Sequence, residues 1–324
     1  MLKRLLALAV ATAALVAPTL AQADDYPVRP IKLINPFPAG GPADIIARTI
    51  GQRMQEILGQ PIVVESRAGA GGVTGVDFVA KSAPDGYTIG ISSPGALAIN
   101  PSFQTSMPYN VQKDLAPISL VVRVPEILVA GSAVPAKTLP EFIAYAKQKN
   151  GQGMNFGSTG PGGMPHLAAE LLILKAGIKA THVPYKGAAP AVNDLLGNQF
   201  QFMFADIPIL LPQVKAGNFT ALAIGSAKRS PALPDLKTTV EQGYPDVLAD
   251  NWYGFIAPAA TPPAILAKLN KATNEALQDK GVIDKLALQG ANVEGSTPEQ
   301  LAALIASETK RWGDVIKQAN LKLE

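Results

Sequence analysis

The chain has 324 residues, 48% of them hydrophobic and 16% charged, which allows one large or two compact domains and argues against disorder. Its net charge is +3, but the basic residues form no run in the sequence, so nothing indicates a nucleic-acid-binding surface. The absence of cysteine excludes disulfides and thiolate sites, and with only two histidines, His166 and His182, no multi-histidine metal site is expected.

The N-terminus has the layout of a secretory signal peptide. Two basic residues precede an unbroken apolar run over residues 5–16, and Ala21-Gln22-Ala23 follows as a small-x-small cleavage site. A membrane anchor is the alternative, but the run is too short to span a bilayer comfortably. We therefore expect residues 1–23 to be removed after Ala23 and the mature protein to be exported.

The first part of the mature chain alternates strand-like runs with helical periodicity. Short β-branched runs end at glycine or proline, and apolar residues at helical spacing follow them. Alternation of this kind favours a parallel α/β sheet. The predicted strands are Ile31–Ile34, Pro61–Glu65 and Tyr87–Ile91, with helices over residues 45–57 and up to residue 80 between them.

A second round of the same pattern begins after Pro125. Two amphipathic helices, after residues 263 and 299, follow it and are expected to pack on an outer face. Scattered prolines and polar residues over 228–250 suit a crossover between domains. The predicted strands of this round are 127–130, 155–158, 182–185, 200–204 and 221–225, and its predicted helices begin at residues 139, 166 and 188.

Three glycine-rich loops follow predicted strands: the first loop (38–44), the second loop (69–72) and the third loop (157–163). The first and third each open a helix, so each can aim free N–H groups and a positive helix end at an anion. Neither contains Lys or Arg, so backbone amides would hold the anion. Tight strand-to-helix turns without a ligand are an equally open interpretation.

Nucleotide and hydrolase motifs are missing. No Gly-Lys pair supports a P-loop, and Thr74 stands where a dinucleotide fingerprint needs its third glycine. No Gly-x-Ser-x-Gly elbow or His-Glu-x-x-His motif occurs. A Ser-His-Asp triad of Ser158, His166 and Asp206 would have no spacing to support it.

Several single residues have two interpretations. His166 lies in the first turns of a helix beside the third loop, where local capping or packing is favoured over a catalytic base. His182 is expected to be structural. Asp206 follows a predicted strand, so it either faces a cleft or caps the next helix, and both stay open. Trp252 and Tyr253 are more typical of a core than of a ligand platform.

An ordered set of short motifs runs through nearly the whole mature chain. It comprises 36–41 with Asp44 and Arg48, 63–67 with the second loop, 83–88, 157–168, 183–187, 211–217 and 257–262. In this set the chain closely resembles the substrate-binding receptors of tripartite tricarboxylate transporters, the Bug family. The resemblance implies a ligand carboxylate held by backbone amides of the first and third loops, with ordered waters bridging to the protein. Pro42 and Gly163 depart from the family pattern and remove polar groups from the ligand side, which leaves the ligand's identity open.

The predicted fold is a two-lobed α/β periplasmic binding fold of the Venus-flytrap type, with two Rossmann-like lobes and a ligand cleft between them. Lobe one is assigned to 24–124 plus 250–324 and lobe two to 125–249, with the first and third loops facing each other across the cleft. The candidate ligand-binding residues are Phe37, Ala39, Gly40, Gly41, Asp44, Ser93, Ser158, Thr159, Gly160, Gly163, His166, Tyr185 and Asp206.

The predicted function is capture of a small organic carboxylate, such as a dicarboxylate, tricarboxylate or aromatic acid, by closure of the lobes, and delivery to the membrane subunits of a transporter. No cofactor, metal, nucleic acid or catalysis is expected, and the protein is expected to be a monomer. A periplasmic hydrolase and a ligand receptor for a sensor kinase are the alternatives.

Overall fold

The computed structural model describes residues 25–103 and 106–322. The predicted signal peptide and its cleavage site after Ala23 lie outside these ranges. Among the helices described, none is both long and apolar enough to cross a bilayer.

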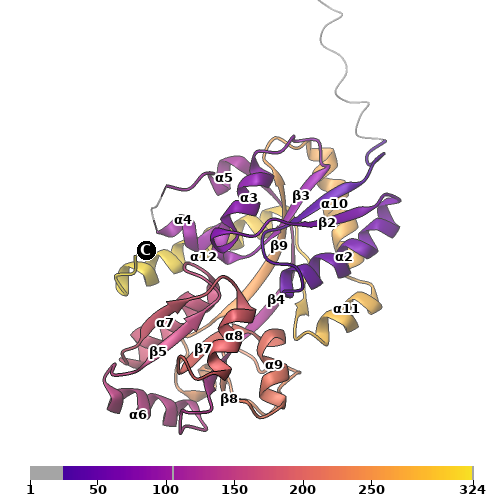
Figure 1. Cartoon of the computed structure of the whole chain (residues 1–324). Coiled ribbons are helices and arrows are strands. Elements are labelled where there is room, and N and C mark those ends of the chain that lie inside the picture. Colours follow the sequence, from indigo (N-terminus) through magenta and orange to yellow (C-terminus); the bar gives the residue numbers. More distant parts are fainter. Residues whose placement is uncertain (1–24, 104–105, 323–324) are drawn as a thin grey trace, which may run out of the picture.

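One mixed sheet of ten strands runs through both halves of the molecule (Figure 1). Its order is β2-β1-β3-β9-β4-β7-β5-β6, and β8 and β10 pair in addition with β4. Pairing is parallel among β1, β2 and β3 and among β5, β6 and β7, but antiparallel around β4. The strands are β1 (Ile31–Asn35), β2 (Ile62–Ser66), β3 (Thr88–Ser92), β4 (Leu115–Gly131), β5 (Asn155–Ser158), β6 (Thr181–Pro184), β7 (Phe202–Asp206), β8 (Phe219–Ile224), β9 (Asp250–Pro258) and β10 (Asn292–Val293).

Helices cover both faces of each half of the sheet, as apolar strands buried on two sides require. In the upper half of Figure 1, α2, α10 and α11 pack on one face, and α3, the π-helical turn η3 and α12 on the other. In the lower half, α6 and α7 oppose α8 and α9. The helices are α2 (Pro42–Leu58), α3 (Val73–Ala80), α4 (Asn100–Ser102), α5 (Val111–Asp114), α6 (Leu139–Lys149), α7 (Met164–Ala176), α8 (Ala188–Leu196), α9 (Ile207–Lys215), α10 (Pro263–Ala276), α11 (Lys280–Ala287) and α12 (Pro298–Gln318), with the short turns η2 (Ala70–Gly72), η3 (Gly95–Ile99) and η4 (Val240–Gln242).

Strand β4 joins the two halves. As far as Pro125 it pairs with β9, and from Glu126 onward it pairs with β7 and β8. The two-lobed α/β fold predicted from the sequence is confirmed, while the lobe boundaries themselves stay predictions. The sequence pattern indicated only residues 127–130 as a strand here, whereas β4 has 17 residues because it serves both lobes.

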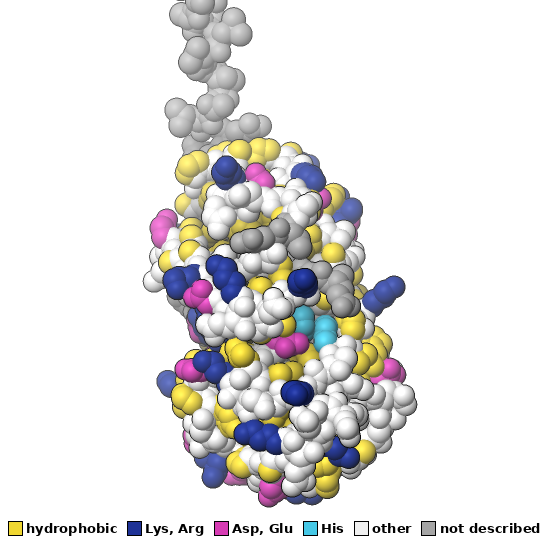
Figure 2. Space-filling view, turned by 90° about the vertical axis from the view of Figure 1, so that its left-hand side faces the viewer, with side chains coloured by type: hydrophobic (Ala, Val, Ile, Leu, Met, Phe, Trp, Pro, Cys, Tyr) yellow, Lys and Arg dark blue, Asp and Glu magenta, His cyan; other side chains and the backbone are white. Residues whose placement is uncertain are grey.

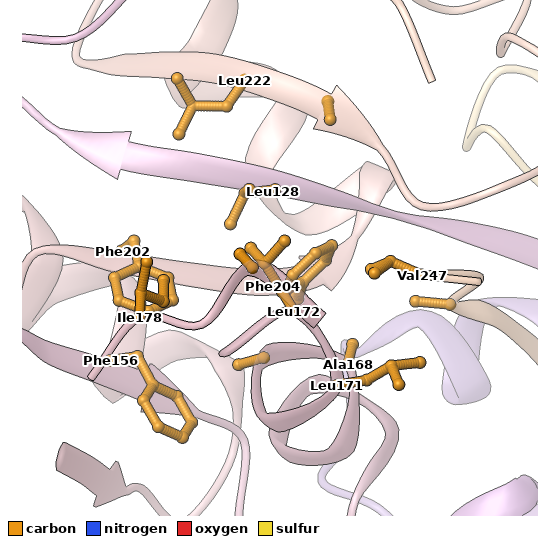
Figure 3. Close-up of a cluster of buried hydrophobic side chains, with 14 of the residues drawn as sticks. Leu128, Phe156, Ala168, Leu171, Leu172, Ile178, Phe202, Phe204, Leu222 and Val247 are labelled. Atoms are coloured by element: carbon orange, nitrogen blue, oxygen red, sulfur yellow. The ribbon is translucent and has the colours of Figure 1, made fainter. Parts of the chain in front are cut away.

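The lobe-two core lies between the sheet and helix α7 (Figure 3). Phe156 of β5 and Phe202 and Phe204 of β7 share this cluster with apolar side chains of α7. Trp312, near the end of α12, belongs to the same cluster. The first half of α12 instead packs into a lobe-one cluster through Leu301. The last helix therefore contributes to the cores of both lobes.

Candidate functional site

The first loop leaves β1 and enters α2, and polar side chains hold its shape. Asn35 accepts a hydrogen bond from the Phe37 N–H at 3.1 Å, and the Asp44 carboxylate accepts from the Gly40 N–H at 3.0 Å and from Arg48 at 2.9 Å. Burial raises the pKa of Asp44, but these hydrogen bonds outweigh it and hold that pKa below its usual range. Asp44 is thus ionised and stabilises the loop. Its carboxylate already accepts the hydrogen bond of the Gly40 N–H, so this amide is not free for a ligand.

The start of α2 is the part of the first loop that remains available to a ligand. This helix begins after Gly41 without a hydrogen bond from any capping side chain, and Pro42 occupies its first turn. Ala39 is exposed and Phe37 and Gly41 are half-buried at this end. An uncapped helix N-terminus carries a partial positive charge and is suited to an anion.

The third loop leaves β5 at Ser158 and is tied back onto that strand. Ser158 Oγ accepts the Gly160 N–H at 3.2 Å and lies 2.6 Å from His182 Nε2. The Gly162 N–H donates to His166 Nδ1 at 3.2 Å. Helix α7 then begins after Gly163, again with no capping side chain.

The two histidines form a stacked pair behind this loop. Their rings lie 3.9 Å apart and 10° from parallel, and the Phe156 ring stacks on His182 as well. Burial, and after it the neighbouring His166, lowers the pKa of His182 to about 3. Figure 2 shows histidine side chains beside an acidic side chain at the level where the upper and lower parts of the molecule meet. The structural role predicted for His182 stays a prediction.

Loops from the two lobes lie in contact with each other. A Cβ atom built on Gly71 of the second loop would lie 3.4 Å from the Pro161 carbonyl oxygen, and one built on Gly95 would lie 3.5 Å from the Gly162 oxygen. The Asn100 amide donates to the Gly95 oxygen at 2.8 Å and reaches the Gly162 oxygen at 3.5 Å. Both are ordinary van der Waals distances, so a Cβ atom at either glycine would just contact the third loop. The structure is therefore one in which the lobes touch.

Asp206 lies at the carboxyl end of β7, where the sequence placed it, and its side chain is 4% exposed. Its carboxylate accepts from the Asn251 amide at 2.9 Å and from the Tyr253 hydroxyl at 2.8 Å, both on β9. It makes no capping hydrogen bond to α9. Burial raises the pKa of Asp206 to about 6 although these two hydrogen bonds lower it. Its contacts tie the lobes together, and a ligand role for it stays a prediction.

The remaining predicted ligand-binding residues lie in or near the glycine loops, and their burial and hydrogen bonding differ. Ser93 follows β3 and is 6% exposed, Thr159 and Gly163 are half-buried, and the Tyr185 hydroxyl donates to Asp194 at 2.8 Å. Sequence reasoning missed Asn35 and Asn100, each of which stands before a proline. An Asn-Pro pair is typical of turns in which the asparagine side chain hydrogen-bonds to nearby backbone. This pattern could have identified Asn35 and Asn100 from the sequence.

Ser158 is fully buried, its Oγ accepts the Gly160 N–H, and it lies 2.6 Å from His182 Nε2. In the described ranges no group of three or more His, Asp or Glu side chains could hold a metal ion. A hollow of about 240 Å³ lies away from the glycine loops, between α2 and α11. It is lined by charged side chains of both signs, among them Arg53, Glu56, Asp279 and Lys285.

Comparison with known proteins shows which family the chain is similar to. The profile of the family described as "Tripartite tricarboxylate transporter family receptor" matches residues 46–321. The chain is 43% identical over 316 residues to protein BugT of Bordetella pertussis, a match that covers 97% of this chain and 96% of that protein.

Two similar solved structures contain a ligand. Rpa4515 of R. palustris with adipate is 33% identical and has a TM-score of 0.87, covering 92% of this chain and 99% of that one. MatC of Rhodopseudomonas palustris with bound malate is 34% identical and has a TM-score of 0.83, covering 90% of this chain and 100% of that one.

Proposed function

Because the chain belongs to the tripartite tricarboxylate transporter receptor family, we propose that it captures a small dicarboxylate in the periplasm and delivers it to the membrane subunits of such a transporter. Adipate and malate, the acids named with two similar structures, are both dicarboxylates. Ligand sites occur preferentially where domains meet, and here the glycine loops of both lobes meet.

The observation that carries the proposal is the pair of uncapped helix starts. Helices α2 and α7 come from different lobes, begin directly after Gly41 and Gly163, and have no side-chain cap. Pro42 and Pro165 have no N–H, and the Asp44 N–H bonds to the Gly41 carbonyl oxygen, so each helix start offers its remaining first-turn N–H groups and a positive helix end. Neither loop contains a basic residue. Amides that would otherwise be desolvated on closure gain a partner when a carboxylate lies between them.

Capture then follows from contacts with both lobes. A ligand that touches α2 on one side and α7 on the other stabilises the closed form over the open form by its differential affinity. No bond is made or broken. The candidate residues of the first and third loops, with Ser93 and Tyr185, are the proposed surroundings of the ligand.

Thermal-shift and calorimetric titrations with malate, adipate and benzoate test this function. A dicarboxylate at 100 times its Kd should stabilise the fold by about 2.7 kcal/mol, whereas its monomethyl ester should bind far more weakly because one amide set loses its anion. Equal binding of diacid and monoester would refute the dicarboxylate class. If neither malate nor adipate binds, mass spectrometry of the small molecule that co-purifies with the periplasmic protein identifies the acid class.

Delivery to a transporter has its own test. Deleting the gene should abolish uptake of the bound acid by cells, and uptake should return with the full-length protein. If uptake is unaffected but transcription in response to the acid is lost, the protein serves a sensor kinase, the alternative that binding measurements alone do not separate.

A further inference from the structure

Asn100, which precedes β4 in the chain, reaches the third loop of the other lobe with its side-chain amide. Its Nδ2 atom lies 2.8 Å from the carbonyl oxygen of Gly95 and 3.5 Å from that of Gly162. Asn100 is 5% exposed, so protein surrounds the amide. A Cβ atom built on Gly71 of the second loop would lie 3.4 Å from the same nitrogen. One amide group thus lies where the second loop, η3 and the third loop meet.

The neighbours of this amide decide which of its two ends faces the third loop. The carbonyl groups of Gly95 and Gly162 are both acceptors, and the NH2 group of asparagine has two N–H donors, one for each. The amide oxygen in the same place would face two other oxygens. The Gly95 oxygen also accepts the backbone N–H of Asn100, which closes the π-helical turn η3. This turn therefore brings the side chain back over its own first residue, beside the third loop.

The residue before Asn100 ties this segment to α7 as well. Ile99 is fully buried and belongs to the lobe-two core cluster, which also contains Met164 and Leu167 of α7. Met164 is the first residue of that helix and follows the third loop directly. The chain before β4 thus shares an apolar core with the helix that the third loop opens, and this core keeps Asn100 beside the loop.

The third loop needs a contact of this kind because its own backbone is permissive. Gly162 has a φ of +67°, and Gly160 and Gly163 lie close by, so the glycines do not fix the loop's shape by themselves. Among the described contacts, the Gly162 N–H donates to His166 within lobe two, whereas its carbonyl oxygen faces Asn100. Helix α7 begins directly after Gly163, so a shift of Gly162 also displaces the start of this helix.

We propose that Asn100 is a positioning residue that holds the third loop, and with it the start of α7, at a fixed distance from the start of α2. This inference rests on the proposed function, because it concerns the loop assigned there to the ligand. If one carboxylate of a diacid lies at each helix start, the distance between the two starts selects the length of the diacid. Asn100 acts through Gly162 in this role and does not itself touch the ligand.

The first test is hydrogen exchange of the mature protein without a ligand. Asn100→Asp keeps the shape of the side chain but replaces its donor group by a carboxylate oxygen. Peptides that cover residues 157–168 should exchange about fivefold faster than in wild type, the effect of losing one hydrogen bond, while peptides of α6 in the same lobe keep the wild-type rate. Asn100→Ala, which adds no charge, should show the same local change. Wild-type exchange over 157–168 in both variants overturns the proposal.

Asn110→Ala is the matched control. Asn110 also precedes β4, and its side chain accepts hydrogen bonds from the backbone N–H groups of Gln112 and Lys113 at the start of α5. Removing this cap should lower the midpoint of urea unfolding, but exchange over 157–168 and ligand binding should stay as in wild type. If this variant loosens the third loop as much as Asn100→Ala does, a general loss of stability explains both and the proposal fails.

The second test measures binding of malate and of adipate by calorimetry in wild type and in these variants. Loss of one hydrogen bond should weaken binding of the preferred acid by about three- to tenfold in Asn100→Asp and Asn100→Ala. A loop that is no longer held should also discriminate less between the shorter malate and the longer adipate, so the ratio of their Kd values should move toward one. Equal weakening for both acids would indicate a merely structural loss and contradict the positioning role.

The two tests separate this inference from the proposed function. Faster exchange of the third loop with wild-type affinity for both acids overturns the role of Asn100 in capture and leaves dicarboxylate capture intact. If neither acid binds wild type, the dicarboxylate proposal fails, and the exchange result alone decides whether Asn100 holds the third loop.

Discussion

Replacing Glu126 by glutamine should remove a pH-dependent cost of folding. Glu126 lies on β4 where the strand passes between the lobes, is 0% exposed, and has no hydrogen-bond partner at either carboxyl oxygen within the described part of the chain. Burial raises its pKa well above 4.5, and Asp206, its partner on β7, and Asp250 raise it further. Burial therefore disfavours the charged carboxylate here, and the isosteric amide of glutamine replaces the group without a charge.

The magnitude follows from linkage. A carboxyl group whose folded pKa is raised contributes most to stability below its unfolded value of 4.5, and the contribution is lost as the pH rises toward the folded pKa. Each pH unit in that window costs wild type about 1.4 kcal/mol of unfolding free energy. Over the part of the range from pH 5.5 to 7.5 that lies below the raised pKa of Glu126, Glu126→Gln should thus gain about 1.4 kcal/mol per pH unit relative to wild type.

Urea unfolding of both proteins at these two pH values measures the difference directly. Glu275→Gln, on the exposed side of α10, is the matched control and should follow wild type at both pH values. A variant whose stability runs parallel to wild type from pH 5.5 to 7.5 would show that Glu126 is charged in the folded protein or titrates as in the unfolded chain, and would refute the reasoning.

Three further changes test other parts of the site. Asp206→Ala should lower the free energy of unfolding by about 2–4 kcal/mol in urea, because it leaves two buried donors unpaired; a loss below about 1 kcal/mol contradicts the interlobe role. Gly95→Val should push the third loop away, so small-angle scattering with saturating ligand should keep the larger radius of the open form, and normal compaction would disprove this. Arg67→Gln and Arg123→Gln should leave ligand affinity unchanged in calorimetry, because these side chains pair with Glu65 and Glu294; loss of binding in either would show that an ion pair, not amides, holds the carboxylate.

Much of the fold was readable from the sequence because its signals are local. The alternation of β-branched runs with helical periodicity predicted β1, β2 and β3 to within one residue at each end. The length of β4 was not readable, since Pro117 and Pro125 interrupt its pattern and its first part is a strand because β9 pairs with it. Pairing with a strand more than a hundred residues away leaves no periodic signal in either segment.

The candidate site was predicted in part, for a similar reason. Glycine loops before helix starts are visible in the sequence, so the first and third loops could be identified as candidate anion sites. Whether Asp206 faces a ligand or a protein donor depends on which distant groups reach it. Tyr253, 47 positions from Asp206, illustrates this, because composition and spacing place it only in a core.

Helix α12 has a bearing on how this protein unfolds. Its first turns complete one apolar core through Leu301 and Ile305, and its last turns complete the other through Trp312 and Ile316. Opening either core thus removes the support that this helix gives to the other, which couples the two halves thermodynamically. The two lobes should melt in a single cooperative transition, and a fragment of residues 125–249 made alone should expose the apolar surface that the final helix covers.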